Sequence, residues 1–193
     1  IVGIALVDMY SKWGCLETAK TLSKKLQNQD VVSWNATIAT YAKNEQGEEA
    51  LNYFKQMQNE GFSPNAITFA CSLKACASLG DTVKGREIHA DVERRGLLER
   101  SLVVGNALVD MYAKCGHLVK AQEAFDKLPR RDVVSWNTLI ASHVKYGFNL
   151  EALENFKEMQ KEGFSPDAVT FVCSLKACGN IGAIVKGIEL HND

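Results

Sequence analysis

Three asparagines recur near the starts of predicted helices and carry groups that could recognise another polar molecule. Asn35, Asn106 and Asn137 each closely follow a pair of adjacent valines. An asparagine amide both donates and accepts hydrogen bonds, so it can match the edge of a pyrimidine base. A helix-capping or turn role would also place asparagine near a helix start. The residue type and its recurrence leave both interpretations open.

Lysine recurs at a second fixed position, near the predicted end of the same helices. Its members are Lys12, Lys43, Lys114 and Lys145. A cation at a helix C-terminus stabilises the helix dipole. The same side chain can bind a phosphate of a nucleic acid. The two roles are compatible, and the sequence favours neither.

The elements that must position these residues form a repeated pattern. Shifting the chain by 102 residues places ALVDMY at residue 5 on ALVDMY at residue 107, VVSWN at 31 on VVSWN at 133, and CSLKAC at 71 on CSLKAC at 173. A match that extends from one end of the chain to the other indicates a repeat protein. Shorter units lie within this period, at residues 1–30, 31–65, 66–101, 102–132, 133–167 and 168–193.

Each unit reads as two amphipathic helices joined by a short turn. In residues 133–167, apolar side chains recur at helical spacing in two runs, and Gly163 and Pro166 follow the second run as a helix stop. The stripe residues are Trp136, Leu139, Ile140, Val144, Leu153, Phe156 and Met159. One such pair is too small to bury its apolar faces, so neighbouring units must stack. The sequence therefore predicts an all-α solenoid.

Composition and motifs exclude several functions. The chain has 193 residues, 46% hydrophobic and 23% charged, with a net charge of −1, so any nucleic-acid binding must depend on local basic side chains. No apolar run is long enough to span a membrane, and no signal peptide is evident, although we expect the chain to be a piece of a longer protein. The six cysteines show no zinc-type spacing. We expect no catalytic residue, no metal site and no cofactor.

The residues SWNTLIASHVKYGFNLEALENFKEMQKEGFSPD resemble the pentatricopeptide repeat. The 31-, 35- and 36-residue units are similar to the S, P and L repeats of the plant PLS subclass, in the order S, P, L, S, P and a partial L. The resemblance implies a right-handed superhelical solenoid of helix-turn-helix repeats that binds single-stranded RNA, one base per repeat. It also implies a mitochondrial or chloroplast location, and a role in recognising sites for C-to-U RNA editing or another RNA-processing step.

The family's base-reading positions are the fifth and the last residue of a repeat, with the second residue packing against the base. Carried over, the pairs are Asn35 with Asn65, Asn106 with Asp132, and Asn137 with Asp167, and the packing residues are Val32, Val103 and Val134. In the family code Asn with Asp reads uridine, and Asn with Asn reads cytidine or uridine. The four recurring lysines match a phosphate-contacting position of the family.

Two kinds of unit depart from the code. The L-type units have Ala70 and Val172 at the fifth position, which cannot hydrogen-bond a base, and the first unit has Ile4 there, which leaves Asp30 without a polar partner. The predicted RNA is therefore 5′-N-Y-N-U-U-3′. The resemblance also implies that L-type units bind editing cofactor proteins.

A helical-repeat scaffold for protein partners, with little RNA affinity by itself, is the alternative function. Solenoids present long grooves that suit peptides, and a net charge near zero is compatible with this. End-to-end self-association through apolar helix faces is a further expectation. We expect no membrane partner.

Overall fold

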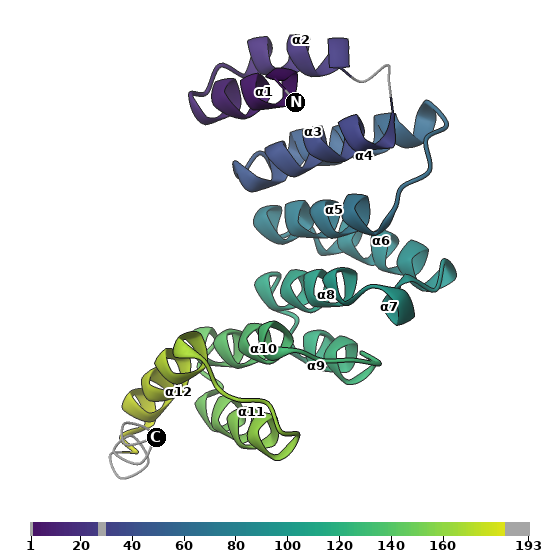
Figure 1. Cartoon of the computed structure of the whole chain (residues 1–193). Coiled ribbons are helices and arrows are strands. Elements are labelled where there is room, and N and C mark those ends of the chain that lie inside the picture. The colour runs from purple at the N-terminus through teal and green to yellow at the C-terminus, as the bar shows by residue number, and fades with distance from the viewer. Residues whose placement is uncertain (1, 27–29, 184–193) are drawn as a thin grey trace. The chain divides into compact units, whose positions relative to one another are not determined.

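All regular secondary structure in the described part of the chain is α-helical (Figure 1). The structure, a computed structural model, describes residues 2–26 and 30–183. The chain divides into two compact units, Ile1–Ala107 (unit 1) and Leu108–Asp193 (unit 2). None of the helices described is long and apolar enough to cross a membrane. The predicted all-α class is confirmed.

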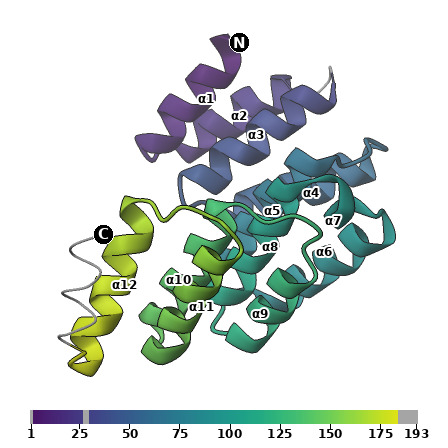
Figure 2. The same ribbon diagram turned by 60° about the horizontal axis from the view of Figure 1, so that its bottom comes forward.

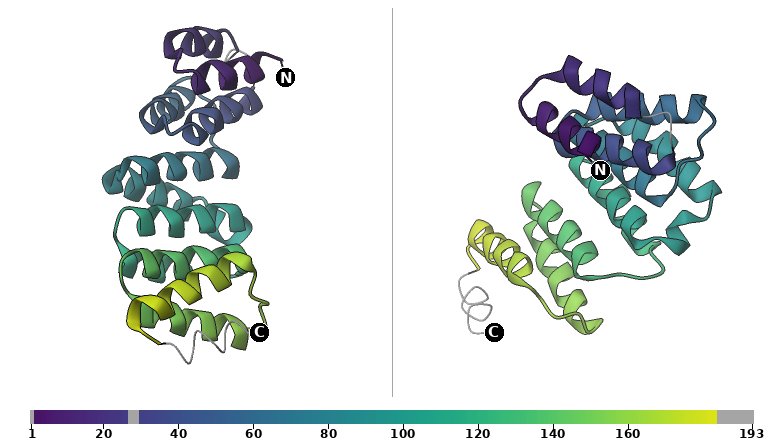
Figure 3. Two further views of the ribbon diagram at one scale, coloured as in Figure 1. Left: turned by 90° about the vertical axis from the view of Figure 1, so that its left-hand side faces the viewer. Right: turned by 45° about the horizontal axis from the view of Figure 1, so that its top comes forward.

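Unit 1 consists of helical hairpins whose first helices stack on one another. Helix α1 packs against α2 and α3, and α3 packs against α4 and α5. Figure 3 shows the first hairpin in purple, with α1 and α2 side by side. The helices are α1 (Val2–Lys12), α2 (Leu16–Leu26), α3 (Val31–Lys43), α4 (Gly47–Asn59), α5 (Ala66–Leu79), α6 (Thr82–Arg94) and the short α7 (Leu97–Arg100), followed by α8 (Leu102–Lys114), which runs on into unit 2.

Unit 2 repeats this arrangement around one central helix. Helix α10 packs against α9, α11 and α12, and α11 packs against α12 (Figure 2). The helices are α9 (Leu118–Asp126), α10 (Val133–Lys145), α11 (Asn149–Lys161) and α12 (Ala168–Ile181). Each hairpin thus buries its apolar stripe against the next helix, as the small size of one pair requires.

A polar side chain caps the first helix of four repeats. The caps of α3, α5, α10 and α12 are Asp30, Asn65, Asp132 and Asp167, and each accepts a hydrogen bond from a backbone N–H in the first turn. Such N–H groups have no partner within the helix, so these residue types favour helix starts. Every cap is the last residue of a sequence unit, so the helix of the next unit begins immediately after it.

The predicted apolar stripe forms the core of unit 2. Trp136 is 2% exposed, Leu139 and Met159 are completely buried, and the other stripe residues are buried as well. Gly163 adopts a positive φ of 84° after α11, which confirms the predicted left-handed helix stop. The helical period read from the sequence therefore identified the buried face correctly.

Gly47 allows the closest approach between α4 and α5. A β-carbon added there would lie 2.7 Å from Leu79 Cγ and 2.9 Å from the backbone oxygen of Ala75. We expect Gly47→Ala to destabilise unit 1 by about 1–3 kcal/mol, because the backbone of α5 would have to move. The measurement is the urea midpoint followed by far-UV circular dichroism.

Gly179 in α12 provides the matched control. A β-carbon there would meet no atom within 4 Å. Gly179→Ala should stabilise by about 0.5–1 kcal/mol through reduced backbone entropy of the unfolded chain. A stabilising effect of Gly47→Ala would contradict the close packing of α4 on α5.

Candidate functional site

The fold brings together two of the predicted base-reading pairs. Asn35 Nδ2 donates to Asn65 Oδ1 at 3.1 Å, and Asn137 Nδ2 donates to Asp167 Oδ1 at 2.9 Å. The partners are 30 positions apart in sequence, so only the stacking of one first helix on the next brings them into contact. The fifth and last residues of these units therefore form one site.

A closed ring of hydrogen bonds holds the pair in unit 2. The Asp167 backbone N–H donates to Thr170 Oγ1 at 3.1 Å, and that hydroxyl donates to Asn137 Oδ1 at 2.5 Å. The Asn137 amide then donates back to the Asp167 carboxylate. Each hydrogen bond polarises the next, so the ring fixes the amide orientation more firmly than one contact would.

Unit 1 contains the same ring with an amide in place of the carboxylate. The Asn65 backbone N–H donates to Thr68 Oγ1 at 3.0 Å, and Thr68 Oγ1 donates to Asn35 Oδ1. The Asn35 amide closes the ring at Asn65 Oδ1. Thr68 and Thr170 are fully buried and were not identified as site residues from the sequence. A hydroxyl three residues after the last residue of a unit was the signal that could have identified them, because this spacing is typical of a capping box.

The capping bonds decide which atoms of the unit-ending residues remain available. Asn65 Oδ1 accepts from the backbone N–H groups of Ile67 and Thr68, at 3.0 and 3.1 Å, so its NH₂ group is left to other partners. The hydrogen bonds described for the Asp167 carboxylate all end on Oδ1, which leaves the lone pairs of Oδ2. One site therefore offers a donor where the other offers an acceptor.

The two members of each pair differ in exposure. Asn35 and Asn137 are only 6% and 9% exposed, whereas Asn65 and Asp167 are exposed. The backbone N–H of Thr170, followed by the Asn137 amide, holds the pKa of Asp167 below its ordinary value. The carboxylate is thus kept ionised and acts only as an acceptor.

The predicted capping alternative for the asparagines is wrong. Asn35, Asn106 and Asn137 each lie at the fifth position of a helix, in α3, α8 and α10, and the unit-ending residues supply the caps described for α3 and α10. Asn106 lies in unit 1, whereas Asp132, which caps α10, lies in unit 2.

Aliphatic side chains at the second position of each unit are exposed beside these sites. Val32, Val103 and Val134 are 69%, 64% and 58% exposed. Ile67 and Val169, at the same position of the L-type units, are 57% and 52% exposed and were missed from the sequence. The sequence signal that could have identified them is their position as the second residue of a unit, the position that Val32, Val103 and Val134 also occupy. Apolar side chains so exposed can cover one face of a bound ring.

The L-type units lack the polar pair, as predicted. Val172 of α12 is 65% exposed and Ala70 of α5 is half-buried. Asp30 serves as the cap of α3, where its carboxylate accepts from Ser33 N at 2.8 Å. The side chain of Ile4 lies outside the described residues.

The four recurring lysines are each the last residue of a helix. Lys12, Lys43, Lys114 and Lys145 end α1, α3, α8 and α10, and all are exposed. Lys12 and Lys114 form ion pairs with Asp8 and Asp110, each at 2.8 Å. Exposed pairs of this kind stabilise weakly, so they leave the ammonium groups available to a competing anion.

The cysteines have no described role in the site. All six are free, and Cys76 and Cys178 are buried, as expected for small helix residues. Burial raises the pKa of the Cys71 and Cys173 thiols, which disfavours the reactive thiolate.

Comparison with known proteins identifies the repeat. The PPR repeat family model matches residues 29–78 and 131–180, and the PPR repeat model matches residues 106–133. Together, residues 29–78 and 131–180 make up about half of the chain.

Two curated relatives come from Arabidopsis thaliana. The chloroplastic pentatricopeptide repeat-containing protein CRR2 is 44% identical over 96% of this chain and 28% of its own length. The chloroplastic pentatricopeptide repeat-containing protein DOT4 is 41% identical over 94% of this chain and 21% of its own length. The chain therefore spans about a quarter of the length of these relatives.

Solved structures show the same fold. The crystal structure of the pentatricopeptide repeat protein PPR10 from maize matches with a TM-score of 0.74 at 23% identity, over 98% of this chain and 28% of that protein. PPR10 in complex with an 18-nt psaJ RNA element matches with a TM-score of 0.76 at 20% identity, over 91% of this chain and 26% of that protein. The predicted architecture of stacked helical repeats is confirmed.

The ring in unit 2 predicts a pH-dependent contribution of Asp167 to stability. Because the pKa of Asp167 is lower in the folded chain than in the unfolded one, the carboxylate stabilises the fold above the unfolded pKa. This contribution is lost as the pH falls through the folded pKa. Wild type should therefore exceed Asp167→Asn in urea midpoint by a constant amount between about pH 5 and 8, and the difference should shrink towards pH 3.

Asp167→Ala is the control for the capping role. It removes the acceptor altogether, so it should be less stable than Asp167→Asn at every pH, since Asn retains an oxygen for the Thr170 backbone N–H. A difference between wild type and Asp167→Asn that is the same at pH 3 and pH 7 would contradict the assigned pKa shift.

Proposed function

Because the chain belongs to the pentatricopeptide repeat family, we propose that it binds single-stranded RNA, with one base at each repeat. The observation that supports this most strongly is the pair of hydrogen-bonded rings, which leave different groups available at two equivalent sites. The base-contacting residues of the proposal are Asn35, Asn65, Asn106, Asp132, Asn137 and Asp167. The chain acts as a binding module and not as an enzyme.

The hydrogen-bonding groups that remain available in the Asn137–Asp167 site are complementary to the edge of uracil. Asn137 Nδ2 uses one N–H in the ring and retains a second, and Asp167 retains the lone pairs of Oδ2. Uracil places the O4 acceptor beside the N3–H donor, so O4 accepts from Asn137 and N3–H donates to Asp167. Guanine offers the same order of groups on a larger ring and therefore belongs in the test.

The Asn35–Asn65 site differs by one group. Since Asn65 Oδ1 is occupied by the backbone of α5, its NH₂ faces the base as a donor. The N3 atom of cytosine accepts such a hydrogen bond, whereas the N3–H of uracil would oppose it. The geometry thus favours cytidine within the pyrimidine expected from the family code.

The remaining parts of the proposed interface are the exposed aliphatic side chains at the second position of each unit and the L-type units. Val32, Val103 and Val134 pack on the faces of bases, and Ile67 and Val169 extend this row through the L-type units. Ala70 and Val172 supply no polar group, so those units act as spacers. The proposed RNA is 5′-N-Y-N-U-U-3′, and the C at the second position is favoured over U.

We propose that the parent protein is an organellar RNA editing or processing factor of the PLS subclass. The order of 31-, 35- and 36-residue units supports the subclass. The chloroplastic relatives support a chloroplast location over a mitochondrial one. Editing cofactor proteins are proposed partners of the L-type units. Loss of a specific C-to-U change in plants lacking the protein would test the editing role.

Exchanging the unit-ending residue should exchange the base preference. We expect Asp167→Asn to change the last base from uridine to cytidine, and Asn65→Asp to change the second base from cytidine to uridine. Both residue types can cap a helix, so the fold is retained. Fluorescence anisotropy with A-C-A-U-U and its single-base variants, including guanosine, should show changes of about 5- to 150-fold at the exchanged base alone.

Asn137→Ala is the companion variant. It should weaken binding to A-C-A-U-U and reduce discrimination at the last base, while the choice at the second base is retained. Equal affinity of the wild type for A-C-A-U-U and for an all-purine RNA would refute the proposed code. Absence of any RNA binding would refute the proposed function itself.

The lysines predict a shallow salt dependence. If Lys12, Lys43, Lys114 and Lys145 each bind one phosphate, log K against log salt should have a slope of about −3. Lys43→Ala combined with Lys145→Ala should reduce the slope to about −1.4, because each single-strand phosphate contact contributes about 0.7. An unchanged slope would assign these lysines to helix stabilisation alone.

A further inference from the structure

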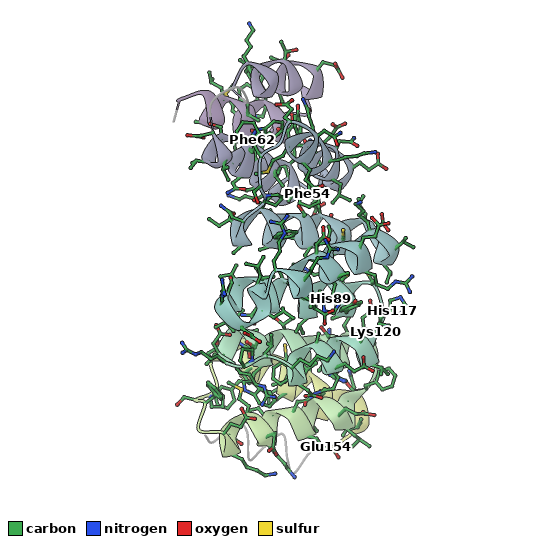
Figure 4. The ribbon with its side chains drawn as sticks, turned by 90° about the vertical axis from the view of Figure 1, so that its right-hand side faces the viewer. Phe54, Phe62, His89, His117, Lys120 and Glu154 are labelled. Atoms are coloured by element: carbon green, nitrogen blue, oxygen red, sulfur yellow. The ribbon has the colours of Figure 1, made fainter. Side chains whose placement is uncertain are left out.

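An open groove lies in unit 2, away from the proposed base-reading site. It consists of two adjoining hollows of about 460 Å³ each, which share Leu118, Val119, Glu123 and Phe148. Helix α9 forms one side, and α11 with the preceding turn forms the other. Figure 4 labels His117 and Lys120 at the start of α9 and Glu154 in α11, so the labelled residues mark both sides of the groove.

A difference between the two copies of the repeat accounts for the hollow. In unit 1, Tyr41 and Tyr53 stack with ring centroids 5.1 Å apart and fill the space between α3 and α4. The equivalent residues in unit 2 are His143 and Asn155, whose Nδ1 and Nδ2 atoms lie 3.4 Å apart. Both line the hollow. The two tyrosine rings of unit 1 thus correspond to smaller polar side chains in unit 2. The difference in size leaves space with hydrogen-bonding groups at its base.

Two apolar residues in the walls of the groove are found only in this copy. Val119 is 74% exposed and Phe148 is 48% exposed. The equivalent positions in unit 1 are Glu17 and Gln46. Since the same fold forms with polar residues at these positions, the fold does not require the exposed apolar surface. Exposed apolar groups that a fold does not need are typical of a binding surface.

The rim of the groove is acidic. Glu123, Glu151 and Glu154 line it, and no ion pair is described for any of the three carboxylates. Two of the three positions are uncharged in unit 1, where they are Thr21 and Asn52. Carboxylates beside apolar walls favour a ligand that is both apolar and cationic.

We propose that this groove binds a peptide segment of a protein partner, in which an apolar side chain is adjacent to lysine or arginine. The apolar side chain enters between Val119 and Phe148, and the cation pairs with the carboxylates of α9 and α11. The volume suits one or two large side chains. RNA is disfavoured here because the three carboxylates outnumber the one lysine of the lining, Lys120, and repel phosphate.

The peptide and the RNA can be bound at the same time. Asn137 lies in the first half of α10, and His143, the residue of α10 that lines the groove, lies about 9 Å further along the helix axis. The proposal therefore does not depend on the RNA-binding function. The peptide selection and titration use no RNA, so the two can fail separately, and RNA enters only as a competitor of the bound peptide.

A peptide-display selection with a random 12-residue library tests the proposal. The wild-type chain is the bait, and the chain with Val119→Glu and Phe148→Gln, the residues of unit 1, is used for counter-selection. We expect peptides with an apolar residue next to Lys or Arg. A synthetic copy of the most enriched peptide is then titrated by fluorescence anisotropy.

Three variants distinguish peptide binding in the groove from nonspecific association through exposed apolar side chains. Leu150→Glu, an exposed apolar position beside the groove that is Glu48 in unit 1, should leave affinity unchanged. The double variant should weaken binding at least tenfold, and Glu154→Asn should weaken it and flatten its salt dependence. Circular dichroism melts establish that each variant folds.

Three results would overturn the proposal: no sequence enriched over counter-selection, enrichment of acidic peptides, or equal weakening by Leu150→Glu. Displacement of the peptide by oligouridine would instead assign the groove to RNA and would equally overturn it.

Discussion

One oxygen atom at the end of a repeat holds two consecutive repeats in register. Asp167 Oδ1 accepts from the backbone of α12, which starts the next repeat, and from the Asn137 amide in α10 of its own repeat. Asn65 Oδ1 does the same for α5 and Asn35 in unit 1. The cap that ends one unit therefore also sets the distance between first helices. Moving either helix would break the ring.

In the proposed function, this shared oxygen couples the stability of the fold to base recognition. The backbone of the following helix requires an acceptor at the unit end, and both Asp and Asn supply one. What differs is the second terminal atom, an oxygen in Asp167 and an NH₂ group in Asn65. The capping contacts constrain the first atom and not the second, so the proposed base preference can change through the second atom alone. Such a division lets one fold carry different specificities without a penalty in capping.

The repeat pattern predicted the fold well, because the fold follows from local rules applied at a fixed period, whereas the pairing of the fifth with the last residue of a unit came from the family resemblance. The stripe that contains Trp136 and Met159 and the stop at Gly163 needed only helical spacing and turn chemistry. The roles of Thr68 and Thr170 were not predicted, since they depend on a hydroxyl of one unit reaching an amide in the unit before it. For the same reason, the sequence left the roles of Asn35 and Asn137 open between helix capping and contact with a base.

Comparison of the two copies distinguishes what the fold requires from what it permits. Trp34 and Trp136 are buried in both, and the ring of Asn and Thr is present in both, so these positions carry the architecture. At the positions of Tyr41 and Tyr53, unit 2 has His143 and Asn155, and the hairpin forms in both units. The hairpin therefore forms with the stacked aromatic pair or without it, although each large buried aromatic contributes several kcal/mol of packing where it is present. The fold thus does not fix the identity of these two residues, and the smaller pair in unit 2 leaves space that the proposed peptide can occupy.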